Sequence, residues 1–144
     1  MRAVAITTAE IVRFVDLFAE RIHAARDELT ALDSAIGDAD HGINMDRGMT
    51  AVHELLPSLA DGDAGSLFKQ VGMKLISTVG GASGPLYGTF FLRLGTSLAG
   101  ATDVTPEQLA EAFKAGLDFS TREMTPADDA KLVARVGEEL SKVK

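Results

Sequence analysis

Hydrophobic residues recur three and four positions apart along most of this chain, which is the spacing of one buried face of an α-helix. Glycine-rich breaks and helix-capping residues divide the pattern into separate segments. No segment alternates apolar and polar residues over a useful length, as a half-buried strand would. The pattern therefore predicts an all-α protein, an antiparallel up-and-down helical bundle or barrel with short connections.

The limits of the expected helices follow from their caps. Thr7 (or its neighbour Thr8), Asp63, Thr105 and Thr125 are placed as N-caps, and Pro follows the last two at the first helical position. Helices are expected over residues 8–32, 44–62, 64–79 and 86–98, with two more that begin near residues 106 and 126. The residues expected to face the core are Ile11, Phe14, Val15, Phe18, Ile22, Met45, Met49, Val52, Leu56, Leu59, Leu67, Val71, Leu75, Leu86, Phe90, Leu94, Leu98, Leu132, Val136 and Leu140.

Composition narrows the class of protein. The 144 residues, 46% of them hydrophobic, are enough for one domain with its own core. A net charge of −7 without a basic run argues against a nucleic-acid partner. The chain has no cysteine, which excludes disulfides, zinc–thiolate sites and thiol catalysis and fits a cytoplasmic protein. No segment is expected to cross a membrane or to act as a signal peptide.

The stretch 32–48, LDSAIGDADHGINMDRG, is the first candidate for chemistry. It holds four aspartates, Asp33, Asp38, Asp40 and Asp46, beside a single base, Arg47. Carboxylates this close disfavour one another's ionisation, and a bound cation would remove that cost. Oxygen ligands with at most one imidazole suit a hard cation such as Mg²⁺ or Ca²⁺. Since Mg²⁺ in proteins usually also contacts phosphate oxygens, the stretch predicts a phosphate site nearby.

Residues 77–90, STVGGASGPLYGTF, supply that candidate phosphate site. The glycines allow the backbone to approach a ligand, and successive N–H groups in such a turn can bind an anion. The following helix N-terminus adds partial positive charge, and Ser83 can cap it or donate to a phosphate oxygen. Neither a Walker A loop nor a Rossmann fingerprint is present. One helical hairpin separates the two stretches, so both should lie at the same end of the bundle.

Each feature alone also has a purely structural interpretation. Asp33 could end a helix, and Asp38 could form an Asx turn. Asp46 is interpreted as an acid in the first turn of a helix, outside the ligand set. His23 and His53 fall in helical patterns without a recognisable partner, and no role is assigned to them.

Together, GDADHGINMDRG and GGASGPLYGTFF resemble the corresponding blocks of the ADP-binding L subunit of dihydroxyacetone kinase. Both blocks match as near-continuous stretches with the expected gap between them. The resemblance covers about residues 11–117 of a single nucleotide-binding domain, 1–144. It implies an antiparallel helical barrel that holds a nucleotide at one end.

The resemblance also implies the site residues. Asp33, Asp38 and Asp40 would hold two Mg²⁺ ions that bridge the phosphates of ADP or ATP. His41 would contact the phosphates rather than the metal. The nucleotide-binding set is expected to be His41, Gly42, Ile43, Asn44, Ala82 and Ser83. No catalytic nucleophile is expected, because phosphoryl transfer depends on positioning and charge neutralisation.

The bacterial form of this family, in which the L chain is separate, implies partner proteins. A phosphotransferase-system M subunit rephosphorylates the bound ADP, and the L subunit passes the phosphoryl group to dihydroxyacetone held by the K subunit. A homodimer is also open. Two other functions remain: a nucleotide-binding regulatory module of the same fold without turnover, and a calcium-binding helical protein. The spacing disfavours the calcium protein, because it is not that of an EF-hand loop.

The tail, residues 118–144, departs from the family. Family members continue after Gly116 with a segment similar to RGKAEPGDKTM, whereas this chain reads LDFSTREMTPADDAKLVARVGEELSKVK. We therefore expect a barrel whose last helices are missing or replaced at the C-terminal end.

Overall fold

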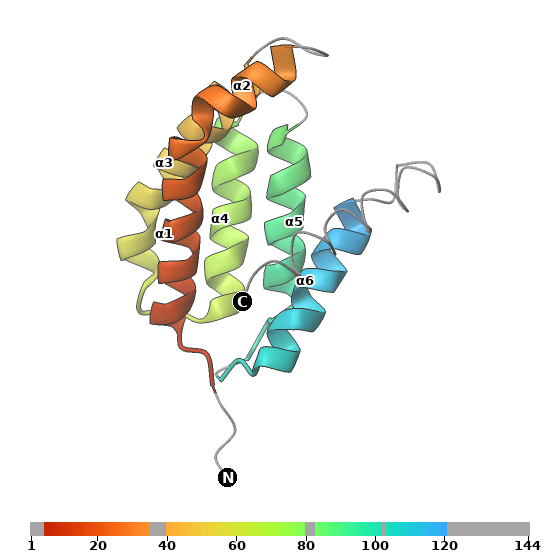
Figure 1. Cartoon of the computed structure of the whole chain (residues 1–144). Helices are drawn as coiled ribbons and strands as arrows, with labels where there is room; N and C mark the ends of the chain where they lie inside the picture. The colour runs from red at the N-terminus through yellow and green to blue at the C-terminus, as the bar shows by residue number, and fades with distance from the viewer. Residues whose placement is uncertain (1–4, 35–39, 80–82, 102, 121–144) are drawn as a thin grey trace.

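The structure is a computed structural model that describes residues 5–34, 40–79, 83–101 and 103–120 (Figure 1). These residues form the helices α1 (Thr8–Ala24), α2 (Arg26–Ser34), α3 (His41–Leu59), α4 (Ala64–Thr78), α5 (Ser83–Ser97) and α6 (Pro106–Ser120). The described residues form no strand beyond an isolated antiparallel bridge between Ile6 and Val104. The predicted all-α class is confirmed. The helix expected from residue 126 lies outside the described residues.

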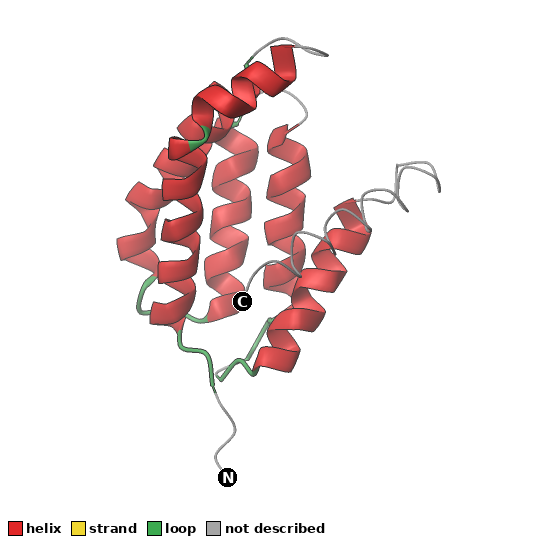
Figure 2. Cartoon of the chain, in the orientation of Figure 1, coloured by secondary structure: helices red, strands yellow, loops and turns green. Residues whose placement is uncertain are grey.

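The helices run up and down side by side, with α4 and α5 at the centre of the view (Figure 1). α3 packs beside α4, α6 packs on α5, and α1 packs on α3, while α2 lies across the beginning of α3. The start of α3, the end of α4 and the start of α5 therefore meet at one end of the bundle. The connections described between α3 and α4 and between α5 and α6 lie at the other end (Figure 2). None of the described helices combines the length and the apolar run needed to cross a bilayer.

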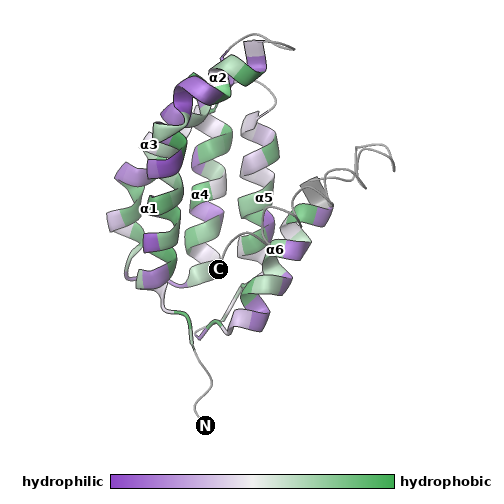
Figure 3. Cartoon of the chain, viewed as in Figure 1, coloured by the Kyte–Doolittle hydropathy of each residue, from purple (hydrophilic) through white to green (hydrophobic). Residues whose placement is uncertain are grey.

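The core follows the predicted stripes on α3 and α4. Met45, Met49 and Val52 are fully buried on α3, and Leu67 and Val71 are buried against them on α4. Purple, hydrophilic positions are most frequent on α1, α2, α3 and α6, whereas α4 and α5 are mostly apolar or near neutral (Figure 3). This distribution places the two most apolar helices in the middle of the bundle and the polar faces of the others toward solvent.

The predicted inward stripe on the fourth helix was partly wrong. Leu94 and Leu98 are buried as expected, but Leu86 is 46% exposed and the unpredicted Phe91 is buried. α5 instead packs glycines against α4: a Cβ built at Gly88 would lie 2.9 Å from a backbone oxygen of α4 and 2.3 Å from a side-chain carbon of α4. This close approach turns the glycine face inward and leaves Leu86 outside.

On α1, the prediction for Phe14 was also wrong. Its side chain is 44% exposed, although its ring contacts that of Phe113 edge to face at 5.9 Å. Ile11 and Val15, on the same predicted stripe, are buried. Phe14 lies at the edge of the stripe, where α1 faces α6 rather than the centre of the core.

The helix predicted over residues 8–32 is two helices, which meet at Ala25. An aspartate on α3, Asp46, accepts hydrogen bonds from His23 Nδ1 (2.8 Å) and from Arg26 Nη1 (3.2 Å), one on each side of the break. The Arg26 carbonyl also lies against Gly42, where a Cβ would be only 1.8 Å from its oxygen. The break thus allows α2 to bend across the start of α3. Asp46 therefore binds both sides of the break and is not an acid in the first turn of α3, as was predicted. The prediction that His23 has no partner was also wrong.

Candidate functional site

The two predicted motifs meet at one end of the bundle because three segments pack closely there. Val79, just after α4, lies between a glycine of α3 and a glycine of α5. A Cβ at Gly48 would lie 2.1 Å from Val79 Cγ2, and one at Gly84 would lie 2.5 Å from the Val79 carbonyl oxygen. Both glycines are buried. These contacts hold the start of α5 close to the first turns of α3.

A hydrogen bond joins the two motifs directly. The Oγ of Ser83, the first residue of α5, lies 2.8 Å from Nδ1 of His41, the first residue of α3. Both helices begin three residues earlier than the sequence pattern predicted. The earlier start places His41, Gly42 and Ile43 in the first turn of α3, where backbone N–H groups have no partner within the helix. Two helix N-termini, each with partial positive charge, therefore lie side by side.

Asp33, at the end of α2, is tied to the start of α3. Its Oδ2 accepts hydrogen bonds from the backbone N–H of Asp40 at 3.1 Å and of His41 at 3.4 Å. Asp33 therefore lies at the N-terminus of α3, close to the His41–Ser83 pair. A carboxylate held there by backbone donors can cap the helix and can also bind a metal. Both of these hydrogen bonds go to Oδ2, so they do not use the lone pairs of Oδ1.

Asp40 occupies the N-cap position of α3 without capping it. Its side chain makes no hydrogen bond to the first turn, whereas Asp63 at the N-cap of α4 accepts one from Ser66 N at 2.8 Å. The hydrogen bonds from Ser66 hold the pKa of Asp63 below its ordinary value. The exposed Asp40 carboxylate thus does not cap its own helix, and its oxygens can face a cation instead.

The structure describes three of the remaining predicted residues, Gly42, Ile43 and Asn44. Gly42 is buried against the Arg26 carbonyl, and its lack of a side chain allows α2 to pack closely on α3. Ile43 is 53% exposed, and Asn44 lies at the end of the first turn of α3. Two predicted residues lie outside the described residues. They are Asp38, expected as a metal ligand, and Ala82, expected as a nucleotide contact.

No group of three or more histidine, aspartate or glutamate side chains arranged to hold a metal occurs among the residues that the structure describes. Asp33 and Asp40 are brought together, but their expected companion Asp38 lies outside that set. The three-carboxylate magnesium site therefore remains a prediction.

Sequence reasoning assigned no role to Arg47. Its Nη2 donates to Oδ1 of Asn44 at 2.7 Å, and its Nε donates to the carbonyl oxygen of Thr78 at 3.2 Å. The signal was present, since Arg47 is the single base in the acidic stretch and lies three positions after Asn44, on the same helix face.

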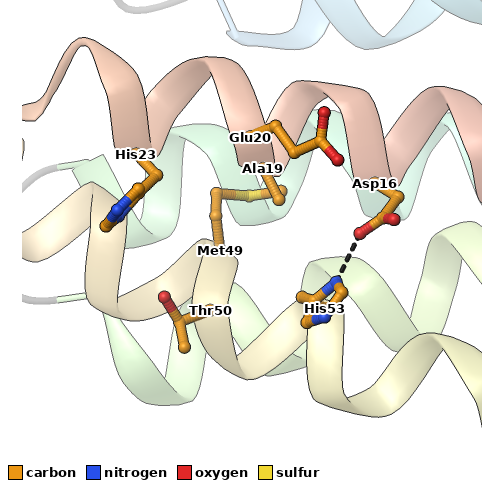
Figure 4. A pocket seen from close by; sticks show the side chains of 7 residues that line it. All are labelled: Asp16, Ala19, Glu20, His23, Met49, Thr50 and His53. Atoms are coloured by element: carbon orange, nitrogen blue, oxygen red, sulfur yellow. Dashed lines mark hydrogen bonds and ion pairs between the residues drawn. The ribbon is translucent and has the colours of Figure 1, made fainter.

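A second polar cluster lies away from these motifs, in an open groove of about 190 Å³ between α1 and α3 (Figure 4). The groove is lined by Asp16, Ala19, Glu20, His23, Met49, Thr50 and His53. Nδ1 of His53 forms a hydrogen-bonded ion pair with Asp16 on the facing helix. The assignment of no partner to His53 was therefore wrong. This pair fastens the middle of α1 to α3 and does not include a residue of either motif.

The His53–Asp16 pair predicts a pH-dependent stability. The hydrogen bond to Asp16, then the charge of Asp16, raises the pKa of His53 above its ordinary 6.5. A group whose pKa is raised by folding contributes stability that is complete below its unfolded pKa and is lost as pH rises through the folded pKa. We expect the thermal midpoint to fall between about pH 6 and about pH 8 by more in the wild-type chain than in His53→Gln. Equal falls in the two proteins would contradict this.

This chain is similar to known proteins over a region that includes the two motifs. Residues 35–131 match the family described as the DAK2 domain. The chain is 43% identical, over 113 residues, to "PEP-dependent dihydroxyacetone kinase, ADP-binding subunit DhaL" of Escherichia coli; the match covers 78% of this chain and 54% of that one. It is 38% identical to the "PTS-dependent dihydroxyacetone kinase, ADP-binding subunit DhaL" of Lactococcus lactis, over 78% of this chain and 56% of that one.

A kinase named for a different substrate is also similar to this chain. The chain is 36% identical, over 61% of its length and 16% of the relative's, to a "D-erythrulose kinase" of Mycolicibacterium smegmatis. The chain spans about half the length of the two dihydroxyacetone kinase subunits. The matched region holds the acidic stretch from residue 35 and the whole glycine-rich stretch, and it covers more than half of the chain. The chain therefore belongs to the DAK2 domain family.

Proposed function

We propose that this chain is the ADP-binding phosphotransferase subunit of a dihydroxyacetone kinase, formed by a single nucleotide-binding domain over residues 1–144. The observation that carries the proposal is the His41–Ser83 hydrogen bond, 2.8 Å long, which brings the starts of α3 and α5 together. Relatives named as ADP-binding subunits share the stretches from which these two residues come.

The paired helix N-termini suit the phosphates of a nucleotide. Backbone N–H groups and the helix dipole favour an anion at such a position. From α3, the backbone N–H groups of Gly42 and Ile43 and the side chains of His41 and Asn44 would supply donors, because the backbone N–H groups of His41 and Asn44 already bind Asp33 and the Asp40 carbonyl. Ser83, with the neighbouring Ala82, would supply donors from the second motif. The hydroxyl of Ser83 and the imidazole of His41 orient each other, so each presents a fixed direction to a bound phosphate.

The carboxylates suit a magnesium ion at the same place. The site has three hard oxygen donors, Asp33, Asp38 and Asp40. The carboxylate of Asp40 does not cap α3, and Asp40 lies beside Asp33. Bound Mg²⁺, two ions in this proposal, would offset the phosphate charge that builds up in the transition state. The protein's own contribution is to hold the phosphates between α3 and α5 and to keep the acids at that end.

The proposed partners follow the printed names of the relatives. The names "PEP-dependent" and "PTS-dependent" kinase "subunit" support a phosphodonor and partner subunits. The family resemblance implies that these partners are an M subunit of the phosphotransferase system and a K subunit that binds dihydroxyacetone. The chain would work in the cytoplasm, as its cysteine-free composition led us to expect. Dihydroxyacetone is preferred over erythrulose because the more similar relatives carry its name.

A coupled assay tests the proposal. The full chain, incubated with dihydroxyacetone, Mg·ADP, phosphoenolpyruvate, the phosphotransferase proteins and purified K and M subunits, should form dihydroxyacetone phosphate. Leaving out this chain should abolish the product. Tight binding of Mg·ADP without any product would instead identify a regulatory nucleotide-binding module of the same fold.

A further inference from the structure

Arg47 makes two hydrogen bonds at the end of the bundle where the two motifs meet. One acceptor is the side-chain oxygen of Asn44, 2.7 Å from Nη2, and the other is the carbonyl oxygen of Thr78, 3.2 Å from Nε. Asn44 ends the first turn of α3, and Thr78 is the last residue of α4. One side chain therefore connects α3 to the end of α4 beside the start of α5.

The first contact fixes the direction of the Asn44 amide. A guanidinium group carries only donors, so the atom of Asn44 that faces it must be the oxygen. The NH₂ group of Asn44 is then turned away from Arg47 and keeps both of its hydrogens for another acceptor. Without Arg47, the amide could flip and present its oxygen, which would repel a phosphate.

The second contact fixes the end of α4. The last carbonyl groups of a helix have no partner within the helix, and a cationic donor satisfies them well. By binding the Thr78 carbonyl, Arg47 sets the distance between α3 and the end of α4, from which the chain continues to Ser83. The planar fork of arginine can serve two acceptors at once, which a lysine ammonium serves less well.

We propose that Arg47 is a positioning residue of the phosphate site, which holds the Asn44 amide with its NH₂ group toward the phosphates while it binds the end of α4. This inference rests on the proposed function, because it assumes a phosphorylated nucleotide at the start of α3. Arg47 acts through Asn44 and Thr78.

Calorimetric titration of the full chain with Mg·ADP tests the inference. Arg47→Met should weaken binding by about 10- to 100-fold, the size of loss known for residues that orient the ligands of a bound metal. Arg47→Lys keeps the charge but not the fork, and its affinity should stay within about twofold of Arg47→Met. The control is Arg13→Met, which removes an equal charge from an exposed position on α1 and should leave the affinity unchanged.

A double-mutant cycle separates positioning from a purely structural effect. Once Asn44→Ala has removed the amide, adding Arg47→Met should weaken binding by clearly less than it does in the wild-type chain, because only the contact with Thr78 is still lost. Slow rotation about the amide C–N bond keeps the two Asn44 NH₂ protons separate in every variant, so the readout is their chemical shift. In the ligand-free chain, Arg47→Met should move both signals toward the values of an exposed asparagine, whereas Arg13→Met should leave them unchanged. Full rescue by Arg47→Lys, or independent multiplicative losses in the cycle, would overturn the inference.

The same titration distinguishes this inference from the proposed function. If the wild-type chain binds Mg·ADP and Arg47→Met binds it equally well, the positioning role is wrong and the proposed function stands. If the wild-type chain does not bind Mg·ADP, both are wrong.

Discussion

Asp40→Ala should abolish magnesium-dependent binding of ADP and leave the folded state as stable as the wild type. The binding loss is expected because Asp40 is a proposed magnesium ligand, and removing a carboxylate leaves too little negative charge to hold the ion against the phosphates. Stability should not change, because the Asp40 side chain makes no capping hydrogen bond to α3. Calorimetry with Mg·ADP and urea unfolding without ligand measure the two effects separately.

Asp63→Ala is the matched control, since Asp63 is also an N-cap aspartate but caps α4, whose start lies at the other end of the bundle (Figure 1). Its side chain accepts from Ser66 N at 2.8 Å, so its loss should cost about 1 kcal/mol of unfolding free energy. Its ADP affinity should match the wild type. A binding loss in Asp63→Ala as large as that in Asp40→Ala would remove the case for a local metal site.

Asp38 carries the same prediction on sequence grounds. Asp38→Ala should abolish magnesium-dependent ADP binding as Asp40→Ala does, because the resemblance implies that both ligate the ion. Unchanged ADP affinity in either variant, with Mg²⁺ present, would contradict the ligand assignment.

Gly42→Ala should lower the free energy of unfolding by at least about 3 kcal/mol, at the upper end of what overpacking costs. The new Cβ would lie 1.8 Å from the carbonyl oxygen of Arg26 and 2.5 Å from Oγ1 of Thr30. A backbone carbonyl cannot rotate away as a flexible side chain can, so α2 must move off the start of α3. That movement would also displace Asp33, and ADP affinity should fall together with stability.

Gly62→Ala provides the comparison for this effect. Its Cβ would meet its nearest neighbour, the Leu59 carbonyl oxygen, at 3.5 Å, which is ordinary contact. Its unfolding free energy should stay within about 0.5 kcal/mol of the wild type. Similar urea midpoints for Gly42→Ala and Gly62→Ala would show that the close approach of α2 to α3 does not exist in solution.

The helices and most of the core could be predicted from the sequence, because burial on one face imposes a periodic pattern. Met45, Met49 and Val52 follow that pattern and are fully buried. Leu86 and Phe14 follow the same spacing and are nevertheless exposed. Their exposure depends on which helix packs against which face, and a periodic pattern carries no information about the neighbour.

The break at Ala25 and the histidine pairs could not be predicted for a related reason. Asp46 reaches His23 across 23 positions, and Asp16 reaches His53 across 37. Local spacing reveals contacts three or four residues apart but not these. The Asn44–Arg47 contact joins residues three positions apart, so local spacing could have predicted it.

The candidate site could be predicted as far as its two motifs and their common end of the bundle. The structure brings His41 to Ser83 and Asp33 to Asp40, which were expected to act together. The roles of Asp38 and Ala82, and a barrel changed at its C-terminal end, stay predictions because those residues lie outside the described part of the chain.

Native mass spectrometry of the full chain with Mg·ADP tests the central claim most directly, namely that one end of this bundle holds a magnesium nucleotide. We expect a complex whose added mass equals one ADP and two magnesium ions, and which Asp40→Ala does not form. A spectrum of the wild-type chain without bound ADP, or a complex that forms equally in Asp40→Ala, would contradict it.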